Sequence, residues 1–121
     1  MRTDGPLPAE HLHYFVTYFS YMAERCFDTA LAHGFHDTDA GNPARIALCH
    51  SELSEALESL RHGDPPDSHL PEFGGAVVEL ADCVIRCADM AEKNGWDLAS
   101  AIAKKMVYNE SRPHMHGGKK F

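Results

Sequence analysis

Apolar residues recur at helical spacing in four segments of the chain, and the alternation typical of β-strands is almost absent. The first segment runs from about Pro8 to His33 and stops at Gly34. The second is expected to start near Asn42, an N-cap residue followed by proline at the first helical position, and to run to about residue 62. The apolar stripe of this second helix is Ile46, Cys49, Leu53, Ala56, Leu57 and Leu60.

Prolines interrupt the helical pattern over residues 64–75, so this stretch is expected to be a connection. A third helix is predicted from about Glu72 or Gly75 to Asn94, with the apolar stripe Val77, Leu80, Ala81, Val84, Ile85 and Ala88. Asp97 is expected to cap a fourth helix that ends near Ser111. The pattern predicts an all-α protein, folded as a four-helix bundle.

The length of 121 residues predicts one helical domain. Within it we distinguish an N-terminal helix over residues 1–33, a core over residues 34–111 and a basic tail over residues 112–121. Five of the eleven basic side chains lie in the last 18 residues: Lys104, Lys105, Arg112, Lys119 and Lys120.

The formal net charge of −7 argues against a general nucleic-acid binder, because phosphate backbones select basic surfaces. No apolar run approaches the ~20 residues of a membrane span, and no signal-peptide pattern opens the sequence. We therefore expect a cytoplasmic protein without membrane or nucleic-acid partners. Its four cysteines lie in apolar helical contexts and are therefore expected to be reduced thiols: Cys26, Cys49, Cys83 and Cys87. Cys83 and Cys87 could offer two zinc ligands on one helix face, but no compact second pair completes a zinc site.

Two pairs of acids stand beside the apolar stripes of the second and third helices. Glu52 and Glu55 are three residues apart, as are Glu79 and Asp82, so each pair is adjacent on its helix. If the two pairs face each other, their oxygens suit Mg²⁺ or Mn²⁺, which are hard cations. Periodicity alone leaves a second interpretation open, in which the acids form a solvated helix surface.

The order of these acids resembles the metal-binding signature of MazG-like nucleotide pyrophosphohydrolases, which belong to the all-α NTP pyrophosphatase superfamily. Glu52-x-x-Glu55 is followed after 23 residues by Glu79-x-x-Asp82. The surrounding stretches "ALCHSELSEALESLRHG" and "ELADCVIRCADMA" are similar to the two central helices of that family. The segment "KKMVYNESRPHMHGGKKF" is similar to the end of its short members. The resemblance covers roughly residues 34–121.

This resemblance implies a helical bundle in which four acids hold Mg²⁺, with Mn²⁺ as a possible substitute. The implied metal ligands and catalytic residues are Glu52, Glu55, Glu79 and Asp82, and Glu55 has the alternative role of orienting the attacking water. The implied reaction hydrolyses a nucleoside triphosphate to the monophosphate and pyrophosphate. The implied assembly is a homo-oligomer, either a dimer or a tetramer built from dimers.

Substrate contacts are expected from the basic end of the chain. The phosphate-binding candidates share one face of the fourth helix: Lys105, Asn109 and Arg112. Lys119 and Lys120 are candidates to close over the phosphates, with solubility as the alternative role of the tail. Phe35 lies where relatives often carry an aromatic residue near the base, although many have tryptophan there. It is therefore a candidate for base stacking, or otherwise packs against the bundle.

Two alternatives to general (d)NTP hydrolysis stay open. The first is a relative with a narrower substrate, such as dUTP, dCTP, a modified nucleotide, (p)ppGpp or phosphoribosyl-ATP. The second is a non-catalytic helical interaction module whose acids bind no metal. The two classes differ in what they predict for Glu52→Gln, which should abolish activity in an enzyme and change nothing in an interaction module.

Overall fold

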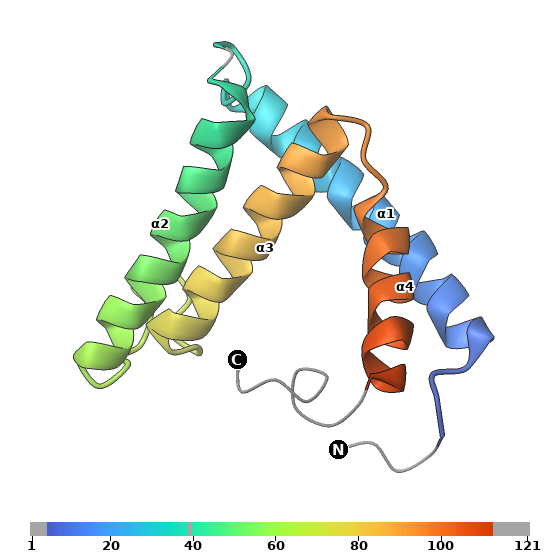
Figure 1. The fold of residues 1–121 in the computed structure, drawn as a ribbon. Helices are drawn as coiled ribbons and strands as arrows, with labels where there is room; N and C mark the ends of the chain where they lie inside the picture. The colour runs from blue at the N-terminus through green and yellow to red at the C-terminus, as the bar shows by residue number, and fades with distance from the viewer. Residues whose placement is uncertain (1–4, 39, 113–121) are drawn as a thin grey trace. The chain divides into compact units, whose positions relative to one another are not determined.

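A computed structural model describes residues 5–38 and 40–112, and these residues form four α-helices and no β-strand (Figure 1). The helices are α1 (Ala9–Ala32), α2 (Gly41–Arg61), α3 (Gly75–Lys93) and α4 (Leu98–Ser111). The all-α prediction is confirmed, and all four expected helices are present close to their expected bounds. Within the described ranges, no helix combines the length and apolar character that crossing a membrane requires.

The chain divides into two compact units. The central unit, Ala23–Trp96, contains the end of α1 together with α2 and α3. The terminal unit, Met1–Met22 with Asp97–Phe121, contains the beginning of α1 and all of α4. The four acids therefore belong to the central unit, whereas the three phosphate-binding candidates of the fourth helix belong to the terminal unit.

The expected cap of α4 is confirmed, but that of α2 is wrong. The Asp97 side chain accepts a hydrogen bond from the Ser100 amide at 3.1 Å, which satisfies a free N–H of the first turn of α4. In α2 the N-cap is Ala40, and the helix begins at Gly41, whose φ of 79° turns the chain into it. Asn42 lies inside the first turn, where its amide group exchanges hydrogen bonds of 3.0 and 2.9 Å with Asn94.

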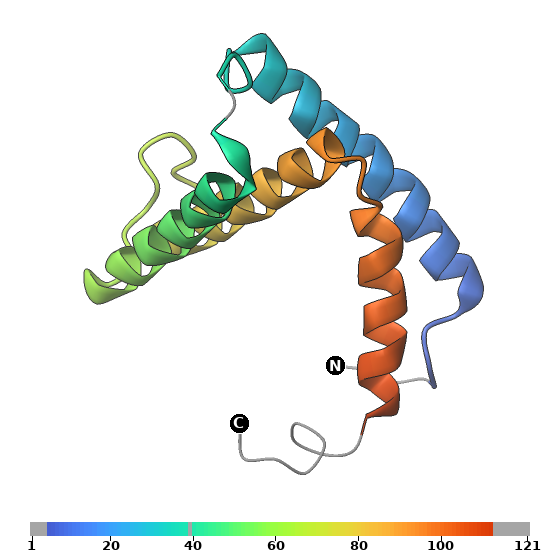
Figure 2. The same ribbon diagram turned by 45° about the horizontal axis from the view of Figure 1, so that its top comes forward.

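Helices α2 and α3 pack side by side as a hairpin, as both ribbon views show (Figures 1 and 2). Small and polar residues fill the side of α2 that is buried: Arg45, Cys49, Glu52 and Ala56. Their spacing of four, three and four residues puts them on one helical face. On α3 the buried residues are Ala88 and Ala91, whose small side chains allow the helices to approach closely.

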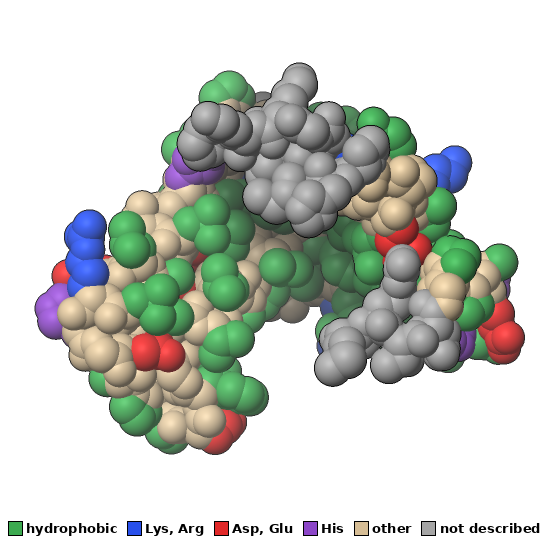
Figure 3. Space-filling model, turned by 60° about the horizontal axis from the view of Figure 1, so that its bottom comes forward, with side chains coloured by type: hydrophobic (Ala, Val, Ile, Leu, Met, Phe, Trp, Pro, Cys, Tyr) green, Lys and Arg blue, Asp and Glu red, His purple; other side chains and the backbone are tan. Residues whose placement is uncertain are grey.

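The large apolar residues of the predicted stripes remain exposed on this hairpin. Between 47% and 59% of each is accessible: Ile46, Leu53, Leu57, Leu60, Val77, Leu80, Val84 and Ile85. Figure 3 shows hydrophobic side chains gathered along the hairpin surface. We call these eight residues the apolar face. Glu52 does not lie on a solvated side of α2, because the side of α2 that carries Cys49, Glu52 and Ala56 is buried.

A tight connection joins α2 to α3 and is built around Asp64, which has a φ of 54°. Its Oδ1 accepts hydrogen bonds from the Ser59 hydroxyl at 3.0 Å and from the Ala76 amide in the first turn of α3 at 2.8 Å. The carboxylate thereby acts as a remote N-cap. A Cβ on Gly74 or Gly75 would collide with Asp64 or Ser59, so both positions require glycine.

Candidate metal centre

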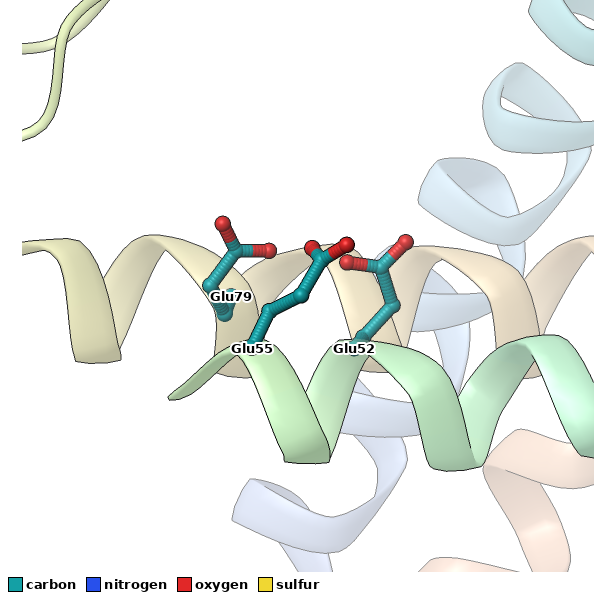
Figure 4. Close-up of side chains that lie close together, drawn as sticks. All are labelled: Glu52, Glu55 and Glu79. Atoms are coloured by element: carbon teal, nitrogen blue, oxygen red, sulfur yellow. The ribbon is translucent and has the colours of Figure 1, made fainter. Parts of the chain in front are cut away.

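Three glutamates from two helices converge in the central unit (Figure 4). Glu52 and Glu55 extend from α2, and Glu79 extends from α3. One carboxylate oxygen of each lies within 4.8 Å of one oxygen of each of the other two. The i, i+3 spacing on α2 and the antiparallel approach of α3 produce this arrangement. The hairpin therefore brings together three of the four acids that the sequence pattern singled out.

Glu52 is the fixed member of this cluster. Its side chain is 9% exposed, and its Oε1 accepts a hydrogen bond of 2.7 Å from Nε of Arg86 on α3. Its other oxygen, Oε2, is also buried and accepts no hydrogen bond from any described residue. A buried carboxylate oxygen without a donor is costly, and a cation can compensate it.

The pKa values of Glu52 and Glu79 are shifted in opposite directions. A hydrogen bond with Glu52, followed by burial and the nearby Glu55 charge, raises the pKa of Glu79 from 4.5 to about 7. Burial by itself would raise the pKa of Glu52, but hydrogen bonds from Arg86 and Glu79 and the Arg86 charge outweigh it and lower that pKa. Below neutral pH, a proton on Glu79 thus relieves the repulsion inside the cluster.

Asp82, the fourth expected ligand, lies one helical turn after Glu79 and is half-buried. It is not a member of the group whose oxygens meet within 4.8 Å among the described residues. It still senses the cluster, because burial and then the charge of Glu52 raise the pKa of Asp82. Its role as a metal ligand stays a prediction.

A cavity of about 280 Å³ lies beside the cluster in the central unit. Its lining combines aromatic, apolar and charged groups: Phe35, Arg45, Leu48, Arg86, Asp89 and Met90. Arg86 belongs to both sites, since its Nε donates to Glu52 and the residue also lines the cavity. Phe35, the candidate for base stacking, is 66% exposed at this cavity. The lining offers hydrogen-bond donors, an acceptor and an aromatic face to one ligand.

His36 joins Arg45 to Asp89, two residues that line this cavity, a role that the sequence pattern did not reveal. Its side chain is 3% exposed and its Nε2 lies 2.7 Å from Oδ1 of Asp89. Nη1 of Arg45 donates to its Nδ1 at 3.2 Å, and since arginine only donates, the Nε2–H donates to Asp89. The ring also stacks on Phe27 with centroids 5.1 Å apart. Two features of the sequence point to this network. Phe35 and His36 are bulky residues in an otherwise polar loop, and Arg45 lies on the same helical face as Cys49, four residues before it.

The phosphate-binding candidates on α4 are exposed and flank one aromatic ring. Nζ of Lys105 lies 4.5 Å, and the guanidinium carbon of Arg112 5.9 Å, from the ring centroid of Tyr108. Lys105 and Asn109 line the same shallow depression of the terminal unit. The remaining candidates, Lys119 and Lys120, lie outside the described residues.

No family model, curated protein or solved structure matches this chain. Its function is therefore inferred from the chemistry of the glutamate cluster and from the sequence pattern alone.

Proposed function

We propose that the protein is a Mg²⁺-dependent nucleoside triphosphate pyrophosphohydrolase of the MazG-like type, which converts (d)NTP to (d)NMP and pyrophosphate in the cytoplasm. The observation that supports this proposal is the convergence of Glu52, Glu55 and Glu79 within 4.8 Å from two facing helices. On a purely solvated helix surface, we would not expect one glutamate to be buried and a second, from the facing helix, to lie beside it.

The donor set suits Mg²⁺ or Mn²⁺. Carboxylate oxygens are the ligands these hard cations prefer, and the buried Oε2 of Glu52 has no competing donor in the described part of the chain. The cation, when bound, neutralises triphosphate charge and lowers the pKa of water for attack. Glu52, Glu55 and Glu79 would hold it, with Asp82 one turn away on α3 as a fourth ligand.

The chain's own residues supply the remaining functions. Arg86 fixes the orientation of Glu52 and places a positively charged residue at the adjoining cavity. That cavity has room for a nucleobase, with Phe35 as a stacking surface and hydrogen-bonding groups around it. The basic residues of α4 would contact the phosphates, because phosphoryl transfer depends mainly on positioning and charge stabilisation. The same role is proposed for Lys119 and Lys120.

The apolar face supports a homo-oligomer. Eight large apolar side chains, each about half exposed on one hairpin, leave apolar surface open to water that a subunit interface could bury. A second copy that packs its own hairpin against this face would bury it in an isologous interface. A dimer, or a tetramer built from dimers, is therefore the proposed assembly.

The test is pyrophosphate release from a panel of canonical and modified NTPs and dNTPs, each with Mg²⁺, with Mn²⁺ and with EDTA. We expect metal-dependent release, lost at least 100-fold in Glu52→Gln and Glu79→Gln. Glu72→Gln removes an exposed carboxylate with no resolved role in the cluster and is the matched control. Release from only one or a few nucleotides would establish the narrower-substrate alternative.

Two results would contradict the proposed hydrolase activity. If the folded protein releases no pyrophosphate and titration calorimetry detects neither Mg²⁺ nor Mn²⁺ binding, the acids are a charged surface of an interaction module. Equal activity of the parent and both cluster variants would also contradict the proposal.

A further inference from the structure

Three of the four cysteines gather where α2 faces α3. Cys49 of α2 is buried, and Cys83 and Cys87 lie one turn apart on α3, both half-buried. The Sγ atoms of Cys49 and Cys87 are 3.7 Å apart, although the residues are 38 positions apart in the sequence. The glutamate cluster and the adjoining cavity use none of these thiols.

We propose that Cys49 and Cys87 form a reversible disulfide that cross-links α2 to α3 under oxidising conditions. The two thiols are already in contact, and a disulfide needs a sulfur separation of about 2.0 Å, which side-chain rotation and a small approach of the helices can supply. Cys83 and Cys87 share one helix, so a bond between them would not join the two helices. This inference does not depend on the proposed hydrolase activity.

The oxidation balances with a peroxide as the oxidant. One thiol reacts with hydrogen peroxide to give a sulfenic acid and one water. The second thiol then attacks the sulfenic sulfur, forming the S–S bond and releasing a second water. Two electrons pass from the thiol pair to the peroxide, and a small dithiol reductant reverses the reaction.

The position of this pair ties it to the neighbouring ion pair. Cys49 precedes Glu52 by one helical turn, and Cys87 follows Arg86 directly. A bond at this level therefore holds α2 and α3 together beside the 2.7 Å contact between Arg86 and Glu52. Burial, followed by the two neighbouring thiols, raises the pKa of Cys87 to about 12. Since the thiolate is the reactive form, oxidation will be slow at neutral pH and faster as pH rises.

Tryptic mapping of the full chain tests the proposal directly, because Arg45, Arg61 and Arg86 place every cysteine in its own peptide. Cys26 falls in residues 26–45, Cys49 in 46–61, Cys83 in 62–86 and Cys87 in 87–93. After treatment with hydrogen peroxide, the monomer band of a non-reducing gel is digested and analysed by mass spectrometry. We expect a cross-link of peptides 46–61 and 87–93, lighter by two hydrogens and cleaved by dithiothreitol.

Thermal unfolding provides the second readout. A disulfide closing a loop of this length restricts the unfolded chain, so the oxidised protein should melt roughly 10 °C or more above the reduced protein. Cys49→Ser and Cys87→Ser should each lose both the cross-link and this shift, whereas Cys26→Ser and Cys83→Ser should keep them. A cross-link between 46–61 and 62–86, or only sulfinic and sulfonic acids at Cys49 and Cys87, would overturn the proposal. So would an oxidised protein that melts no higher than the reduced one.

Discussion

Glu79→Gln isolates the repulsion that the glutamate cluster stores when no cation is bound. In the folded parent, the pKa of Glu79 is raised from 4.5 to about 7, chiefly by its hydrogen bond with Glu52. The protonated form is therefore favoured by folding. This stabilisation is fully present below pH 4.5 and is lost as the pH rises through about 7. Glutamine keeps the shape but cannot ionise, so the variant escapes that loss.

The magnitude follows from the linkage between pKa and stability. A pKa raised from 4.5 to about 7 corresponds to an upper limit of about 3.4 kcal/mol, at 1.36 kcal/mol for each pKa unit. Because Glu79 is only half-buried, solvent screening reduces this contribution to about 1–2 kcal/mol. As the pH rises from 5 to 8, the parent should therefore lose about 1–2 kcal/mol of unfolding free energy that Glu79→Gln does not lose.

Urea unfolding, followed by far-ultraviolet circular dichroism in EDTA at one fixed protein concentration, measures this difference at both pH values. Glu72→Gln is the control and should follow the parent at each pH. Added Mg²⁺ should reverse the order at pH 8, because a ligand at 100 times its Kd stabilises the protein to which it binds by about 2.7 kcal/mol. The proposed coupling would be refuted if the stability of the parent and that of Glu79→Gln changed by the same amount between pH 5 and pH 8.

Three further changes probe the surroundings of the cluster. Arg86→Met leaves Glu52 buried without its partner and should lower the unfolding free energy measured in urea by about 2–3 kcal/mol. The control Arg61→Met breaks an exposed ion pair and should lower it by less than about 0.5 kcal/mol. His36→Ala removes a buried ring and its hydrogen bonds, so the melting temperature should fall by an amount equivalent to about 2–4 kcal/mol; an unchanged value would contradict its role in holding Arg45 and Asp89 together. Leu57→Glu puts a charge on the apolar face, and light scattering after size-exclusion chromatography should show a smaller species; an unchanged mass would exclude Leu57 from a subunit interface.

Helical periodicity and turn chemistry predicted the helices well, because the glycines and prolines at their ends act locally. Gly34, Gly63 and Gly95 all have positive φ after a helix, as expected of C-terminal stops. The N-terminus of α2 was predicted less well, because Asn42 pairs with Asn94, which is distant in the sequence. A local capping rule contains no information about such a partner.

The acid spacing singled out Glu52, Glu55 and Glu79, but periodicity did not reveal that Glu52 is buried. An apolar stripe is normally assumed to face the core, and here α2 buries its narrower side of small and polar residues against α3. That choice depends on how closely two backbones can approach, which in turn depends on Ala56, Ala88 and Cys49. The buried network of His36, Arg45 and Asp89 depends in the same way on tertiary contacts.

The connection centred on Asp64 has a consequence for how the chain tolerates insertions and deletions. Asp64 caps α3 from the end of α2, and Gly74 and Gly75 admit no side chain there, so the first residue of α3 is fixed relative to α2. Adding or removing one residue between Gly75 and Glu79 would rotate the Glu79 carboxylate by about 100° around α3 and away from Glu52. The connection therefore determines where Glu79 lies on α3 relative to Glu52 on α2. Residues 64–75 are therefore a constrained part of the site, although they carry none of its carboxylates.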